Sequence, residues 1–206
     1  MLLAPAASAH RLDEFLQAAL ISVSSSRMEA EIRMVPGVAV LPLVMASVDT
    51  DGNGVVTDAE WNRYAARALR DLSFTIDGLR LQPRLVAAAF PKTEDLKEGL
   101  GEIDLTLRAD LPSGGGARRL VFENRHEARI GAYLVNCLAP DDPKITIDAQ
   151  KRNYTQSSYE LDYTQEGTRA LSYRWLAALA VAAVFILRPA LAWREHRGLR
   201  ASSRRP

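Results

Sequence analysis

Six residues with oxygen ligands lie at nearly every second position between residues 49 and 60. Calcium takes six to eight oxygen ligands, from carboxylates, amides, hydroxyls and backbone carbonyls. The stretch D-T-D-G-N-G-V-V-T-D-A-E fits D-x-[DN]-x-[DN]-G-x5-E, the calcium loop of EF-hands, at every specified position. The sequence therefore predicts a Ca²⁺ site. Its predicted ligands are two carboxylates, an amide oxygen, a backbone carbonyl, a hydroxyl that binds directly or through water, and a bidentate carboxylate: Asp49, Asp51, Asn53, Val55, Thr57 and Glu60.

Other positions of this stretch favour the same interpretation over its alternative, an acidic surface turn that binds no ion. Gly54 stands where the loop must turn sharply, and Val56 is an apolar position that should point inward. Thr57 and Glu60 have the spacing of a capping box, so a helix should begin at the end of the loop.

Helices are expected on both sides of the loop. Pro42 suits the first turn of an incoming helix. After Glu60, apolar residues recur at helical spacing. We therefore predict a helix–loop–helix unit over residues 38–72. The apolar residues of its second helix are Trp61, Tyr64, Ala65, Ala68, Leu69 and Leu72.

Only one stretch of the sequence matches the calcium-loop pattern, although EF-hands usually occur in pairs. A single loop with three ligand carboxylates should bind Ca²⁺ with a Kd of about 10⁻⁴–10⁻³ M, as extracellular modules do. This affinity favours a structural role for the ion over a signalling role.

Other residues could serve different chemistry. If cleavage makes His10 the first residue, its amine and imidazole could bind copper or nickel with His126 as a second ligand. This periplasmic transition-metal accessory role is the alternative function. An acid/base site of Glu123, His126 and Glu127 is a weaker hypothesis, because no nucleophile motif accompanies it. We interpret His126 as a surface or strand-end residue, and we do not expect an enzyme.

Cysteine and tyrosine residues are interpreted as structural. The single cysteine, Cys137, lies in an apolar run and should be a buried thiol, and it excludes a disulfide within the chain. Tyr154, Tyr159 and Tyr163 could form an aromatic binding face. Since Tyr159 and Tyr163 lie on one side of a predicted strand, we favour packing in the core for them.

The first residues read as the remnant of a signal peptide. Ala7-Ser8-Ala9 is an A-x-A cleavage signature, so residues 1–9 would be removed and the mature chain would begin at His10. An Ala-rich tail without a targeting role is the alternative.

A transmembrane helix is predicted over residues 173–193. Nineteen residues from Trp175 to Trp193 are mostly apolar and, as a helix, span about 28 Å, close to the hydrocarbon thickness of a bilayer. Residues 194–206 are rich in arginine and should be a cytoplasmic tail by the positive-inside rule. These features predict a single-pass protein of the bacterial inner membrane with its main domain in the periplasm.

Between the two ends, residues 10–170 read as short strands. Alternating apolar and polar residues predict a strand over residues 27–34 and further strands as far as Tyr163. Residues 15–23 would also suit a helix, and we favour a strand because Ser24-Ser25-Ser26 would then form a hairpin with the next run. Asp77-Gly78 marks a hairpin. The eight or nine strands predict a mainly β fold, an immunoglobulin-like antiparallel β-sandwich into which the EF-hand is inserted. Residues 91–101 are charged and should form a loop.

Composition limits the partners. A net charge of +1 argues against a nucleic-acid partner, because no basic face stands out in the folded part. The expected partners are the calcium ion, the membrane and an unidentified protein of the cell envelope.

A family resemblance rests on the calcium loop together with three further segments: A-H-R-L-D-E-F-L-Q at 9–17, F-E-N-R-H at 122–126 and A-Y-L-V-N at 132–136. In these segments the chain resembles exported bacterial EF-hand proteins of unknown function. It is similar to the extracytoplasmic N-terminal domain of HupE/UreJ-like membrane proteins over roughly residues 10–175. The resemblance implies an exported domain attached to a membrane part. Only one hydrophobic segment follows here, so the nickel or cobalt transport suggested by such relatives is not carried over.

Overall fold

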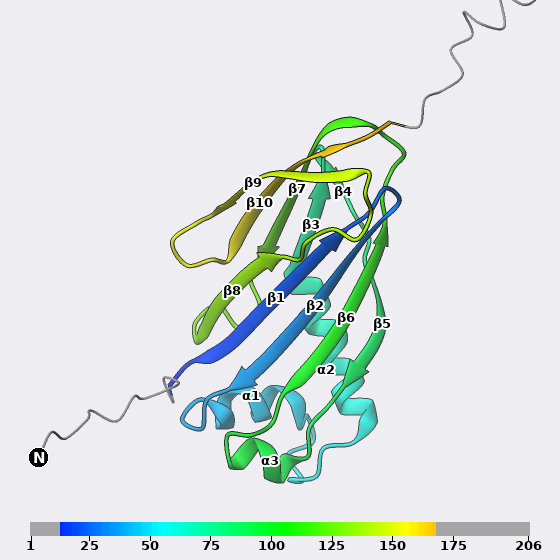
Figure 1. The fold of residues 1–206 in the computed structure, drawn as a ribbon. Helices are drawn as coiled ribbons and strands as arrows, with labels where there is room; N and C mark the ends of the chain where they lie inside the picture. Colours follow the sequence, from blue (N-terminus) through cyan, green and yellow to red (C-terminus); the bar gives the residue numbers. More distant parts are fainter. Residues whose placement is uncertain (1–12, 168–206) are drawn as a thin grey trace, which may run out of the picture. The chain divides into compact units, whose positions relative to one another are not determined.

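A computed structural model describes residues 13–167, which form ten strands and three short helices (Figure 1). The predicted signal remnant at 1–9, His10, the predicted span at 173–193 and the predicted tail at 194–206 lie outside the described residues. Within the described part, no helix has the length and apolar character needed to cross a bilayer.

The first sheet has five strands in the order β5-β6-β2-β1-β8. Its centre is the hairpin of β1 and β2, which turns at Ser24–Ser26 as the sequence predicts. Along β1, fully buried residues alternate with half-buried ones, the period-two pattern of a strand with one face against the core. The strands are β1 (Phe15–Val23), β2 (Arg27–Pro36), β5 (Arg84–Ala89), β6 (Ile103–Asp110) and β8 (Gly131–Cys137).

The second sheet also has five strands, in the order β4-β3-β7-β10-β9. Asp77 and Gly78, both with positive φ, form the predicted hairpin turn between β3 and β4. The strands are β3 (Leu72–Ile76), β4 (Leu79–Arg80), β7 (Gly116–Asn124), β9 (Ile145–Arg152) and β10 (Ser158–Gln165).

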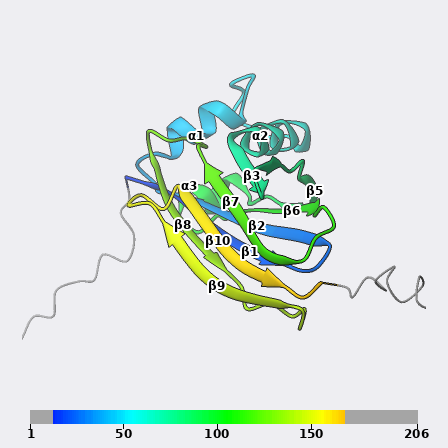
Figure 2. The same cartoon turned by 90° about the horizontal axis from the view of Figure 1, so that it is seen from above.

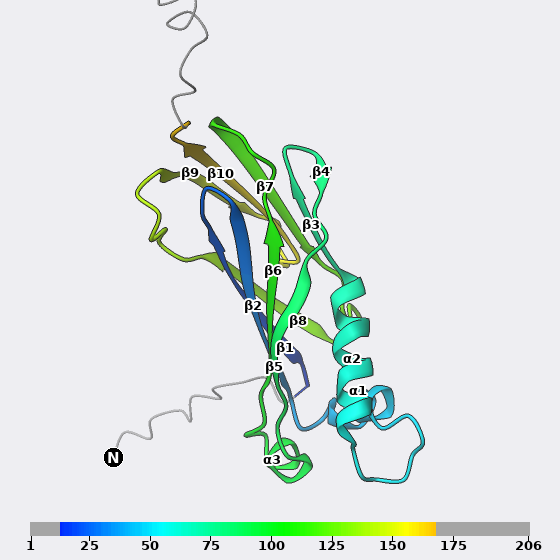
Figure 3. The same cartoon turned by 90° about the vertical axis from the view of Figure 1, so that its right-hand side faces the viewer.

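Apolar residues of both sheets form one core, so the fold is a β-sandwich (Figure 3). Phe74 and Phe122 of the second sheet lie with ring centroids 4.8 Å apart. Tyr159 and Tyr163 are fully buried, which confirms that they pack in the core, whereas Tyr154 is fully exposed.

The predicted antiparallel pairing is wrong at one place: β8 runs parallel to β1. The reason lies in how the chain changes sheets. After β7 in the second sheet, residues 125–130 bring the chain to the first sheet beside the start of β1, with Gly131 paired to Phe15. The new strand then continues in the same direction as its neighbour. Short-range pattern does not reveal such a crossover.

A second difference concerns residues 91–101, predicted as a loop. They contain α3 (Thr93–Lys97), a short helix with two acidic residues in its first turn. Its Leu96 is buried, and this contact with the core fixes a helix that is too short to be stable alone.

The helix–loop–helix unit connects β2 of the first sheet to β3 of the second. Helix α1 (Leu41–Val48) has Pro42 in its first turn, as predicted. Helix α2 (Asp58–Asp71) continues directly into β3, and the loop lies at its opposite end (Figure 3). Figure 2 shows both helices on one side of the strands. The packing of α2 is aromatic at its start, where the Trp61 ring stacks on Phe90 at 5.1 Å.

Candidate metal centre

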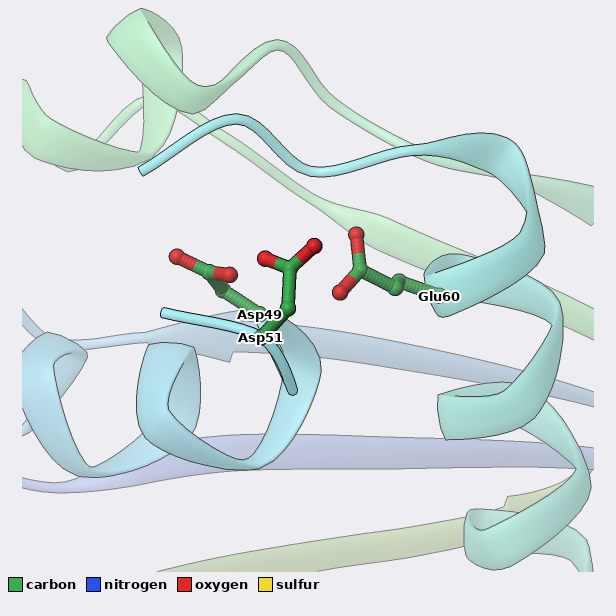
Figure 4. A group of neighbouring side chains, drawn as sticks. All are labelled: Asp49, Asp51 and Glu60. Atoms are coloured by element: carbon green, nitrogen blue, oxygen red, sulfur yellow. The ribbon is translucent and has the colours of Figure 1, made fainter. Parts of the chain in front are cut away.

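Three carboxylates converge in the loop between α1 and α2. Ligand oxygens of Asp49, Asp51 and Glu60 all lie within 4.8 Å of one another. Two oxygens that bind one Ca²⁺ at about 2.4 Å cannot be more than about 4.8 Å apart, so these groups can share an ion. Figure 4 shows Glu60 pointing from the first turn of α2 toward the two aspartates at the other end of the loop.

Hydrogen bonds within the loop hold these side chains in place. The Asp49 carboxylate accepts from the backbone N–H groups of Gly52 and Gly54, both at 2.9 Å. Gly54 has φ +81°, a conformation that suits glycine, which explains the requirement for glycine at this position. The Asn53 side-chain oxygen accepts from Val55 N–H at 2.7 Å, and its amide donates to Asp51.

Glu60 closes the loop against its start and its end. Its side chain is 2% exposed. One carboxylate oxygen accepts from the backbone N–H and hydroxyl of Thr57, and the other accepts from the same two groups of Thr50. These bonds, those of Thr57 first, lower the pKa of Glu60 to about 2. The carboxylate is therefore ionised at neutral pH and aimed at the aspartates, and an ion bound by both of its oxygens would replace some of these four hydrogen bonds.

The predicted capping box is present. Thr57 is the N-cap of α2, its hydroxyl accepts from the Glu60 N–H, and the Glu60 side chain bonds the Thr57 N–H. The Thr57 hydroxyl also donates to Glu60 at 2.9 Å. The Val55 carbonyl has no hydrogen bond within the described part of the chain, so it is free to bind a cation.

One neighbour of the loop was not found from the sequence. The Arg63 guanidinium lies 3.8 Å from the Glu60 carboxylate and 3.2 Å from the Thr50 hydroxyl. Its position one turn after Glu60 on α2 is the signal that could have identified it. The arginine places a positive charge beside the candidate cation site.

The interpretation of His126 as a surface residue is wrong, although it does follow closely on the end of β7 at Asn124. His126 is 1% exposed, and its two ring nitrogens contact Tyr64 and Asp71. A ring engaged at both nitrogens has no free lone pair for a metal. Burial occurs because α2 covers this part of the chain, a contact across about sixty residues that local pattern does not show.

The residues of the weaker acid/base hypothesis do not converge. Glu127 pairs with Arg67 and Glu123 pairs with Arg125, while His126 lies inside the protein.

Cys137 is half-buried at the end of β8, and burial raises the pKa of its thiol to about 11. A thiol with this pKa stays protonated at neutral pH and is a poor nucleophile.

Comparison with known protein families finds no family model that matches this chain, and no curated protein sequence matches it. The resemblance to HupE/UreJ-like proteins thus stays a prediction.

Proposed function

We propose that this protein is a membrane-anchored, extracytoplasmic calcium-binding module with a structural or protein-interaction role. One observation carries the proposal: three carboxylates of an EF-hand sequence lie close enough to share one Ca²⁺, in a loop closed by the capping box of α2. The ligands are Asp49, Asp51, Asn53, the Val55 carbonyl and Glu60, with Thr57 through its hydroxyl or a water molecule.

The ion would act by neutralising the loop and fixing α1 relative to α2. Without a cation, three carboxylates repel one another at short range. An ion that binds only the folded protein stabilises it by RT ln(1 + [Ca²⁺]/Kd), about 1–3 kcal/mol at ordinary excess. The ordered helix pair would then present a surface to an envelope protein partner.

Calcium titration of the purified chain tests the proposal. In calorimetry the wild-type protein should bind one Ca²⁺ with a Kd of about 10⁻⁴–10⁻³ M, and its melting temperature should rise by a few degrees. Glu60→Gln should abolish both effects. Asp58→Asn is the matched control, since it removes the same charge from the same loop at an exposed position that is not a ligand. No heat at millimolar Ca²⁺, or equal loss in the two variants, would contradict the proposal.

The location is proposed from the two ends of the sequence. An A-x-A signature before His10 and an arginine-rich segment after residue 193 agree on an exported domain with a cytoplasmic tail. Protease added outside spheroplasts should digest the domain. Protection of the domain in intact spheroplasts, with digestion after lysis, would contradict this orientation.

We further propose that the sandwich is of the immunoglobulin-like type. It is supported by two five-stranded sheets whose successive strands cross between sheets, as β2 to β3 and β7 to β8 do. An experimental structure with a different strand order would refute it.

The copper or nickel alternative is not carried forward, because its second ligand His126 is buried and engaged at both ring nitrogens.

A further inference from the structure

Helix α2 carries a row of polar side chains that begins with a calcium ligand. Glu60, Tyr64, Arg67 and Asp71 lie at positions i, i+4, i+7 and i+11, which share one face of a helix. Glu60 belongs to the loop, whereas the other three contact the chain that follows β7. Tyr64 and Asp71 bond His126, and Arg67 bonds Glu127. The helix therefore joins the loop to one fixed point of the sandwich.

His126 is the centre of this attachment. Its Nδ1 lies 2.8 Å from Asp71 Oδ2, and its Nε2 lies 2.9 Å from the Tyr64 hydroxyl. A carboxylate can only accept, so Nδ1 donates to Asp71. The neutral ring then accepts from the Tyr64 hydroxyl at Nε2. Both side chains of α2 are thus held by one buried imidazole.

The backbone of His126 is itself fixed to the sandwich. Its N–H donates to the Asn124 side chain at 2.9 Å, and its carbonyl accepts from Gln17 and from the Tyr133 hydroxyl, both at 2.9 Å. The Asn124 amide in turn donates to Gln17 at 3.0 Å. This network holds the imidazole in place, so a change at the ring acts on α2 more than on the sandwich.

We propose that His126 is a positioning residue for the calcium site: through Tyr64 and Asp71 it holds α2 where Glu60 meets the aspartates, so that proton binding at His126 opposes Ca²⁺ binding. The inference rests on the proposed function and adds a regulation of that site. His126 touches no predicted ligand, and its effect passes through the helix.

The surroundings of the ring set the sign of this coupling. Facing it are Tyr64, Arg67 and Asp71 from α2, Glu127 beside it, and Tyr133 from β8. Burial lowers the pKa of His126 below its usual 6.5, against the opposing effect of Asp71. A second ring proton turns Nε2 into a donor, so the Tyr64 hydroxyl oxygen accepts from it and the buried hydroxyl proton loses its acceptor. Protonation of His126 therefore favours a displaced α2, in which the ring regains its ordinary pKa, and Ca²⁺, which needs the docked helix, favours the neutral ring.

The test uses the full chain in mild detergent, with calcium affinity measured by calorimetry at pH 7.5 and 5.5. The Kd of the wild-type protein should rise at least threefold at the lower pH, which still lies above the range where ordinary carboxylates titrate. Tyr64→Phe keeps the ring packing and removes the bond to His126, so it should weaken calcium binding at least threefold at pH 7.5. His126→Gln should reduce the pH dependence.

Tyr159→Phe is the matched control. Tyr159 is also fully buried with one hydroxyl bond, to Gln150 at 2.9 Å, but it lies in β10 away from α2. Its calcium affinity and pH profile should equal those of the wild-type protein. Equal effects of Tyr64→Phe and Tyr159→Phe, or an unchanged pH profile in His126→Gln, would overturn the inference.

Two further readouts keep the outcomes separate. Calorimetry at pH 6 in buffers of different ionisation enthalpy should show proton release on calcium binding by the wild-type protein and less release by His126→Gln. If His126→Gln does not fold, the difference in calcium affinity between Tyr64→Phe and Tyr159→Phe still tests whether the His126 contact positions α2. Absence of calcium binding in the wild-type protein would overturn the proposed function and this inference together, whereas binding without the coupling would overturn only the inference.

Discussion

The proposed calcium loop and the His126 cluster lie along the same helix, and they are built in opposite ways. The loop uses twelve consecutive residues, and the hydrogen bonds between these residues join positions no more than ten apart. The cluster joins Gln17, Tyr64, Asp71, Asn124 and His126, which are separated by up to 109 positions. The loop is mostly exposed, whereas the cluster is mostly buried.

The difference follows from what each region must do. An ion would have to reach its ligands from water, and the carboxylates of Asp49 and Asp51 are accessible, as the proposed calcium site requires. A buried polar network has to be complete without an ion, since an unpaired polar group inside costs about 1–3 kcal/mol. We therefore expect substitutions in the cluster to change mainly the free energy of unfolding, and substitutions in the loop to change mainly the calcium affinity.

The largest expected effect is His126→Leu. The change leaves the Tyr64 hydroxyl and the Asp71 carboxylate without their partner, and it should lower the free energy of unfolding by about 2–4 kcal/mol. Urea unfolding in the presence of a calcium chelator measures this loss of stability. A loss of stability that appears only when Ca²⁺ is present would contradict the contrast between loop and cluster, because the cluster should stabilise the fold without an ion.

Gly54→Ala should have the next largest effect and should act on the ion. A Cβ at Gly54 meets no atom within 4 Å, so only its φ of +81° is at issue, at a cost of about 1–2 kcal/mol. A surface loop without an ion can relax, so the cost should appear as a Kd raised about 5–30-fold. Gly116→Ala, at φ +82° and also without close contacts, is the control. It should lower stability and leave calorimetric calcium affinity unchanged, and the reverse pattern would refute the assignment.

A smaller effect is expected from pH in the absence of calcium. Burial lowers the pKa of His126 in the folded chain, so the unfolded chain binds more protons as pH falls below the usual value of 6.5. Stability from this residue is complete above pH 6.5 and is lost as pH falls toward the folded pKa. Denaturation in chelator at pH 7.5, 6.5 and 5.5 should show the decline, and His126→Gln should show less of it. A wild-type free energy of unfolding that rises as the pH falls from 7.5 to 5.5 would contradict the assignment of a neutral His126 in the folded chain.

Arg63→Ala should have the smallest effect. The arginine side chain is 60% exposed and lies 3.8 Å from Glu60, and exposed pairs of this kind contribute at most about 1 kcal/mol. Removal of a positive charge beside the site should leave the Kd unchanged or lower it by less than about tenfold. Calorimetry at low and high salt measures the change. A large loss of affinity would mean that Arg63 holds Glu60 in place, and the loop would then depend on more than its twelve residues.

Much of the fold could be predicted, because its signals are local. Period two marked β2 and β6, the serine turn at 24–26 favoured a strand for β1, Asp77-Gly78 marked a hairpin, and the capping box marked the start of α2. Helix α3 was missed because one buried leucine, Leu96, fixes it, and a single contact leaves no periodic pattern.

The sequence alone determined the candidate ligands and their order, since a loop of twelve residues carries its donors at fixed spacing wherever it is placed. Tertiary structure alone decided that β8 runs beside β1, that α2 covers His126, and that Tyr64 and Asp71 meet one imidazole. The physical reason is distance along the chain. Hydrogen bonds between near neighbours follow from spacing, whereas a buried network exists only after the two sheets and α2 have excluded water from it.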